Sequence, residues 1–202
     1  MLIRHLRKRP GIHPSAYIAP GAIVCGDVAV GEDARILHGA VVVAEGGRIE
    51  IGRNCIVMQN AVVRSTARHS ASIAEYCLIG PGAHVAGCTL EECVFVATGA
   101  SIFHAARLGA RSEVRVNAVV HVNSRLLPDA TVPIGWVAVG DPAEILPPGE
   151  HQAIWSIQES LNFPQTVYGV QRPRRGDSIM PEVTARLAQA YADHVEDEVI
   201  SQ

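Results

Sequence analysis

The sequence predicts a parallel β-helix, a triangular solenoid of six-residue repeats, over residues 12–146. In each repeat a branched apolar residue leads, Gly or Ala often follows, and a small residue stands four places on, as in residues 12–17, 79–84 and 114–119. Hydrophobic residues make up 48% of the chain and aromatic residues only 4%, which suits a core of many thin, similar layers. The repeats also leave no room for the dozen or so residues that a helical crossover between parallel strands needs.

Each feature of the repeat has a structural role. The leading residue points inward from a short strand, the small residue packs at the corner, and Gly or Asn permits the tight bend. Three such strands close one coil of roughly 18 residues, and coils stack about 4.8 Å apart. Cys55 and Cys77 stand at small positions and are predicted to be reduced packing residues. The five cysteines are odd in number and contain no CxxC pair, so neither a disulfide framework nor a zinc knuckle is expected.

The repeat is interrupted at residues 44–48 and 65–72, and such excursions from a rigid scaffold commonly carry function. Residues 1–11 form an N-terminal segment ahead of the solenoid. Residues 147–202 form a C-terminal helical extension. It is predicted to contain a helix from Pro147 through about Leu161, a linker at residues 172–176 and a second, exposed helix at residues 181–199.

Charge and hydropathy exclude some classes of partner. The net charge is −3, so nothing favours binding to nucleic acid or to an anionic membrane. No apolar stretch approaches the ~18 residues that a membrane span needs. The basic run at residues 4–9 is read as a solvated edge because no signal-peptide core follows it. A cytoplasmic location is expected.

Four features together resemble the gamma class of carbonic anhydrases: the repeats, the loop after Val43, the phrase Val-Gly-Asp-Pro-Ala at residues 139–143, and the helix that follows. The resemblance covers residues 12–161. It implies left-handed coiling, a homotrimer of parallel solenoids, and a zinc ion held between subunits by three histidines. Three histidines with an open water position are typical of a catalytic zinc site.

The chain departs from that family at each ligand position. The resemblance places the three ligands at Arg64, Pro81 and Ala86. A guanidinium is always protonated, and the other two side chains have no donor atom. We therefore expect no metal at the family position and no resident cofactor.

Among the nine histidines, His69, His84 and His104 are candidates for a displaced zinc site. His104 is expected near Gly87, and His121 one coil further along the same face. The other readings are structural. His13 and His38 lie on turns or strand edges, and His151 and His194 are expected on helices, facing solvent.

Arg64 has two readings. It can form a structural ion pair with Glu45 near Gln59, or its planar guanidinium can bind a small anion such as bicarbonate or a carboxylate. In the second reading Glu45, Gln59, His69 and His121 line the same cleft at the subunit interface. Cys88 is not expected to be a nucleophile because no basic partner activates it.

Three functions follow. The first is a trimeric protein related to gamma carbonic anhydrases that does not hydrate CO2 and binds a small anion at the interface cleft. The second is a hexapeptide-repeat acyltransferase that uses coenzyme A or an acyl carrier, with His84 or His104 as general base. The third is a carbonic anhydrase with zinc at the displaced His69, His84 and His104 site.

Overall fold

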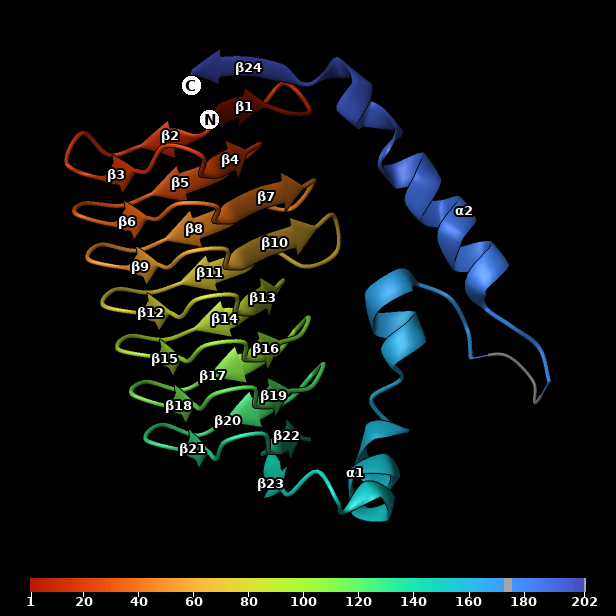
Figure 1. Ribbon diagram of the computed structural model, residues 1–202. Helices are drawn as coiled ribbons and strands as arrows, with labels where there is room; N and C mark the ends of the chain where they lie inside the picture. Colours follow the sequence, from red (N-terminus) through yellow and green to blue (C-terminus); the bar gives the residue numbers. More distant parts are fainter. Residues whose placement is uncertain (173–175, 202) are drawn as a thin grey trace.

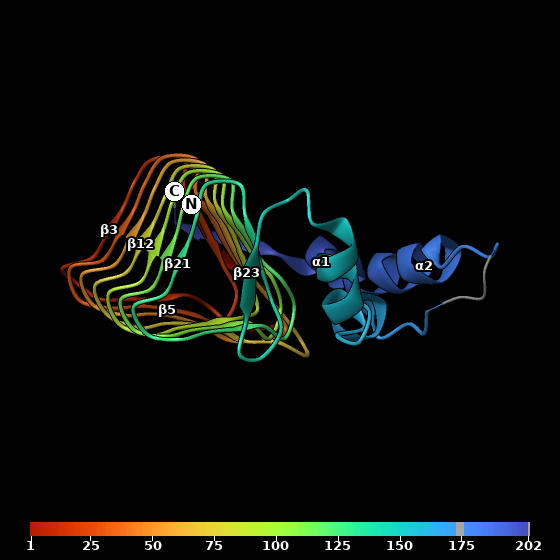
Figure 2. The same cartoon turned by 90° about the horizontal axis from the view of Figure 1, so that it is seen from below.

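The computed structural model describes residues 1–172 and 176–201, and it confirms the predicted solenoid: a parallel β-solenoid of about eight turns. Three sheets form its sides, and the view along the axis shows the triangular outline (Figure 2). Sheet 1 runs in parallel through β1 (Leu2–Arg4), β4 (Ile23–Cys25), β7 (Val41–Glu45), β10 (Val62–Thr66), β13 (His84–Ala86), β16 (Ser101–Ile102), β19 (Val119–Val120) and β22 (Val137–Val139).

The other two sides are built from strands of two or three residues. Sheet 2 contains β2 (Gly11–Ile12), β5 (Val28–Val30), β8 (Ile49–Ile51), β11 (Ala71–Ile73), β14 (Thr89–Leu90), β17 (Arg107–Leu108) and β20 (Arg125–Leu126). Sheet 3 contains β3 (Tyr17–Ile18), β6 (Arg35–Ile36), β9 (Ile56–Val57), β12 (Leu78–Ile79), β15 (Phe95–Val96), β18 (Glu113–Val114) and β21 (Thr131–Val132).

The core consists of apolar columns that run along the axis, because the leading residue of each repeat stacks on its equivalent in the next coil. In sheet 3, Ile36 pairs with Val57, Val57 with Ile79, and Ile79 with Val96, and all four are fully buried. Cys55 and Cys77 are buried free thiols, as predicted.

The corners need a left-handed backbone, which Asn tolerates better than most residues. Asn60 and Asn117 adopt φ values of 58° and 56° at two such corners. The asparagines that recur in the repeat therefore serve the bend.

Both ends of sheet 1 are closed by antiparallel strands. β1 pairs in parallel with β4, so the sheet extends beyond the predicted start at Ile12. β24 (Glu198–Ser201) pairs antiparallel with β1, which brings the two termini together at one end of the solenoid (Figure 1). At the other end β23 (Glu144–Leu146) pairs antiparallel with β22. The prediction of one helix over residues 181–199 was therefore wrong in its last part. There the chain forms β24, which hydrogen-bonds to the otherwise open edge of sheet 1.

The C-terminal extension lies outside sheet 1 (Figure 2). It contains α1 (His151–Gln158), a π-helical turn (Pro164–Tyr168), α2 (Met180–Ala190) and a 3-10 turn (Ala192–Glu196). The predicted linker at residues 172–176 falls mostly on residues 173–175, outside the described part of the chain. Within the described part, no helix is long and apolar enough to span a membrane.

Candidate functional site

The outer face of sheet 1 places three of the predicted site residues, Arg64, Ala86 and His121, in one column. Strand pairing places Arg64 of β10 between Val43 of β7 and Ala86 of β13. Continuing the same register, Phe103 and His121 follow in the next two coils. His121 therefore lies on the predicted face. β7 and β10 are the longest strands of the solenoid, with five residues each, because they include the starts of the two predicted interruptions.

A cavity of about 500 Å³ lies between this face and the C-terminal extension. The solenoid contributes Arg64, His84, Phe103 and His104, and the extension contributes mainly apolar groups: Phe163, Val167, Tyr168, Val183, Leu187, Ala190 and Tyr191. Of the residues predicted to line a cleft between subunits, Glu45 and Arg64 line this cavity within one chain.

Arg64 is held by the extension and not by Glu45. Its Nη2 donates a hydrogen bond to Tyr191 Oη at 2.9 Å, and its Nε is buried with no partner among the described residues. Glu45 instead lies 3.0 Å from His194 Nε2, so the predicted Arg64–Glu45 ion pair is not formed. Gln59 is exposed at the corner before β10, whereas Glu45 pairs with Thr66 at the end of that strand. Gln59 does not line the cavity.

Two further arginines line the cavity, but both have partners outside it. Arg186 pairs with Glu182 and donates to the Gly169 carbonyl oxygen. Arg68 donates to the Gln165 carbonyl oxygen at 3.3 Å. Arg64 is the cavity arginine whose guanidinium keeps a buried, unpartnered N–H among the described residues.

His104 is buried, with 6% of its surface exposed, and neither of its ring nitrogens is hydrogen-bonded within the described chain. Burial, and then the nearby His69, Arg64 and His84, lower its pKa to about 4. Burial and the Arg64 charge likewise lower the pKa of His84. Both side chains are therefore neutral at pH 7. As predicted, His104 lies beside Gly87, whose carbonyl oxygen accepts a hydrogen bond from the neighbouring Ala105 N–H.

The displaced zinc site is not assembled within one chain. His69 Nε2 lies 2.9 Å from the Thr166 carbonyl oxygen, and its ring packs edge-on to His104 with centroids 5.5 Å apart. In the described residues, the clusters whose ligand atoms approach one another within 4.8 Å do not contain the set of His69, His84 and His104.

Of the remaining histidines, some are exposed and others make contacts between the solenoid and the C-terminal extension. His121 is buried, its Nε2 accepts from the Gln158 side chain at 2.8 Å, and burial lowers its pKa. His13, His38 and His151 are exposed, as expected. The prediction that His194 faces solvent on a helix was wrong. His194 contacts Glu45 and stacks on His5, because the segment after α2 returns to the solenoid.

The family's zinc does not fit at its own position in this chain. Arg64 and Ala86 are neighbours on the outer face, and Pro81 lies at the corner before β13. A guanidinium, a methyl group and a pyrrolidine ring offer zinc no donor. No step of a zinc mechanism can be built on these three residues.

No protein-family model matches the chain. In sequence it is similar to the mitochondrial gamma carbonic anhydrase 1 of Arabidopsis thaliana, with 29% identity over 145 residues, which cover 69% of this chain and 50% of the relative. Gamma carbonic anhydrase 2 of the same plant is 26% identical over 200 residues, covering 94% of this chain and 69% of the relative. A probable carbonic anhydrase of Methanocaldococcus jannaschii is 32% identical over 91 residues, 45% of this chain and 57% of the relative. The chain thus spans about half to two-thirds of the length of these relatives.

Two solved structures share the fold. A hexapeptide transferase family protein from Anaplasma phagocytophilum has a TM-score of 0.51 and 26% identity, covering 79% of this chain and 91% of that protein. An acetyltransferase-like protein from Bacillus cereus has a TM-score of 0.52 and 21% identity, covering 78% and 90%, and shows the fold alone. The chain is therefore similar in sequence to gamma carbonic anhydrases, and its β-solenoid is the fold expected of hexapeptide-repeat proteins of that kind.

Proposed function

We propose that this gamma-carbonic-anhydrase-like chain binds a small organic carboxylate in the cavity beside Arg64 and does not hydrate CO2 at the family's zinc position. The observation that carries the proposal is the buried Nε of Arg64, which has no partner in the described chain. An unpaired buried donor costs about 1–3 kcal/mol, more when it is charged, so a ligand that accepts from it gains that amount.

The ligand chemistry follows from the shape of the donor group. A guanidinium presents parallel N–H groups that match the two oxygens of a carboxylate. Arg64 uses Nη2 for Tyr191, and the Tyr191 hydroxyl, which accepts that bond, keeps its own proton to donate. His84 and His104 are neutral at pH 7, so neither adds a second positive charge that would draw the carboxylate away from Arg64.

The rest of the ligand is expected to be apolar. Phe103, Phe163 and Leu187 line the same cavity, and a volume of about 500 Å³ exceeds what bicarbonate needs. Small-molecule sites typically combine such an apolar wall with a few placed polar groups. A carboxylate with an aliphatic or aromatic tail therefore fits better than an inorganic anion.

Calorimetric titration with a panel of carboxylates tests the proposal. We expect one ligand per chain, with an affinity that falls about 10- to 100-fold in Arg64→Gln, since a charge-assisted hydrogen bond contributes about 1.5–3 kcal/mol. The matched control is Arg48→Gln, because Arg48 is an exposed arginine that pairs with Glu50 outside the cavity. Failure of every carboxylate to bind, or equal losses in both variants, would contradict the proposal.

A homotrimer is part of the proposal. A half-buried column runs along the outer face of sheet 1 beside the Arg64 column. It is apolar at Ile23, Val41, Val62, Val119 and Val137 and polar at His84 and Ser101 between them. A second copy would shield this column from water, as the resemblance implies. Light scattering that returns a monomer mass at micromolar concentration would refute the trimer.

A cytoplasmic location is likewise proposed. Cell fractionation tests it, since the Arabidopsis relatives bear mitochondrial names.

Acyl transfer is the second candidate, favoured by the likeness to the Anaplasma hexapeptide transferase family protein. His84 and His104 line the cavity as possible bases. However, a pKa of about 4 makes His104 a weak base at neutral pH. A thermal shift caused by coenzyme A, but not by simple carboxylates, would favour this function over carboxylate binding.

A further inference from the structure

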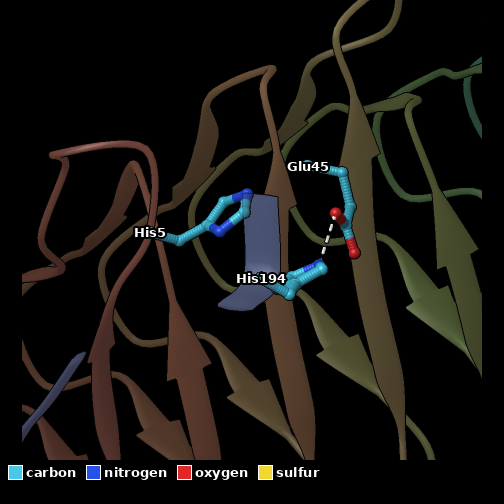
Figure 3. A group of neighbouring side chains, drawn as sticks. All are labelled: His5, Glu45 and His194. Atoms are coloured by element: carbon cyan, nitrogen blue, oxygen red, sulfur yellow. Dashed lines mark hydrogen bonds and ion pairs between the residues drawn. The ribbon is translucent and has the colours of Figure 1, made fainter. Parts of the chain in front are cut away.

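At the end of the solenoid where the termini meet, three distant segments bring two imidazoles and two carboxylates together. His5 lies in the turn after β1, Glu45 ends β7, and His194 lies in the segment between α2 and β24 (Figure 3). Asp197 follows in that same segment, just before β24. One ligand atom each of His5, Glu45 and His194 lies within 4.8 Å of the other two.

We propose that His5, Glu45 and His194 bind one Zn²⁺ ion per chain, at a position separate from the Arg64–Ala86 pair. Imidazole nitrogen and carboxylate oxygen are zinc donors, and two histidines with one glutamate leave one coordination position open. His194 Nε2 and Glu45 Oε2 are 3.0 Å apart. Two donors at about 2.0–2.1 Å from a tetrahedral zinc are roughly 3.3 Å apart, so the pair needs only a small adjustment.

Asp197 supplies the group that orients both rings. Its Oδ1 lies 2.7 Å from His5 Nδ1 and its Oδ2 lies 2.8 Å from His194 Nδ1. Zinc-binding histidines commonly donate their other ring N–H to a carboxylate, which fixes the tautomer and frees Nε2 for the metal. The two rings also stack, with centroids 4.3 Å apart and planes 22° apart, so the imidazoles are held face to face.

Burial and charge agree with a bound dication. The His5 side chain is 2% exposed, Glu45 14% and His194 32%, so the cluster is largely enclosed but open on one side. The Glu45 and Asp197 carboxylates together carry a charge of −2, which a Zn²⁺ ion balances. Paired charges of this kind tolerate burial better than unpaired ones.

Cys25 belongs to an overlapping cluster with His5 and Asp197. In that cluster both Asp197 oxygens are already hydrogen-bonded to histidine Nδ1 atoms. We therefore assign Asp197 to ring orientation and leave Cys25 outside the ligand set.

The consequence concerns the assembly of the fold. His5 and His194 are separated by nearly the whole chain, so one ion would fasten the segment that leads into β24 to the first three coils. His5 and Glu45 also line one end of the Arg64 cavity. The ion would therefore stiffen that end of the cavity wall as well.

The test uses the full chain after treatment with a chelator, titrated with ZnCl2 by calorimetry and with Co²⁺ by visible absorption. We expect one metal per chain and the strong visible bands of a four-coordinate cobalt site. Glu45→Gln, which keeps the shape of the side chain, and His194→Ala should each weaken Zn²⁺ binding at least about tenfold. His151→Ala, an exposed histidine of the same extension, and Cys25→Ser should bind as the wild type does.

Absence of stoichiometric Zn²⁺ binding in the wild type would overturn the proposal. Unchanged binding in Glu45→Gln and His194→Ala would also do so, as would a loss confined to His84→Ala or His104→Ala. If His194→Ala fails to fold by circular dichroism, NMR of the wild type decides. Zn²⁺ must then shift the Nε2 resonances of His5 and His194, and shifts at other histidines alone contradict the site.

Discussion

Arg64 and Ala86 occupy paired positions on β10 and β13 and stand side by side on the outer face of sheet 1. By resemblance these are two of the three zinc-ligand positions of gamma carbonic anhydrases. Adjacent parallel strands lie about 4.8 Å apart, so two imidazoles here could reach one metal ion. The two backbone positions are thus close enough for a ligand pair, whereas a guanidinium and a methyl group give zinc no donor.

Restoring the side chains should restore a metal site. We expect the triple variant Arg64→His, Pro81→His and Ala86→His, made together with His194→Ala, to bind up to one zinc per chain. The His194→Ala variant alone provides the baseline, because it removes the proposed site at the termini. Elemental analysis of the two dialysed proteins gives the comparison. Equal zinc contents would mean that the ligand positions, or the trimer that joins them, are assigned wrongly.

Removing the charge of Arg64 should raise the pKa of His84. Burial and the Arg64 guanidinium both lower that pKa in the native protein, so Arg64→Gln removes the second of these causes. NMR titration of the His84 ring protons measures the change. Arg48→Gln, which changes the net charge equally at an exposed site, should leave the His84 pKa where it is.

The solenoid was predictable from sequence because each coil uses the same local pattern of residues to form its strands and corners. An inward Val or Ile, a small corner residue and an Asn or Gly bend recur, so the pattern is repeated many times along the chain. Ile36, Val57 and Ile79 fall into one buried column as a direct result. Repetition replaces the long-range information that other folds require.

A buried member of such a column should contribute strongly to stability. Ile79 is fully buried, so Ile79→Ala should lower the free energy of unfolding by about 2–5 kcal/mol through lost contacts and a cavity. Ile134, 69% exposed, provides the control, and Ile134→Ala should change that free energy by less than about 0.5 kcal/mol. Urea unfolding followed by circular dichroism measures both. Similar costs for the two variants would contradict the inner columns.

The site was less predictable because it depends on contacts between distant segments. The family resemblance found Arg64, but nothing local indicated that Tyr191 would hold it from 127 residues away. The spacing of apolar residues after Pro181 indicated a helix and could not show that the chain then returns to β1. His194 was therefore assigned to solvent, and its contact with Glu45 was missed.

The neutral, buried state of His104 should make the protein sensitive to acid. In the folded chain burial, His69, Arg64 and His84 lower the His104 pKa from its ordinary 6.5 to about 4. Between these two values the unfolded chain binds a proton that the folded chain does not. The free energy of unfolding should therefore fall as pH falls from 6.5 towards 4, by on the order of 1 kcal/mol per pH unit from this residue, and the full contribution is present above 6.5.

His104→Gln removes the titrating group, so its stability should fall less steeply over the same pH range. His84 and His121, whose pKa values are also lowered, still titrate in the variant, so the informative quantity is the difference in slope between the two proteins. Urea unfolding at several pH values between about 7 and about 4.5 measures it. His13→Gln, at an exposed position, should follow the wild type. Parallel curves for wild type and His104→Gln would mean that His104 accepts its proton in the folded state, and that the cavity is wetter or more mobile than its closed packing indicates.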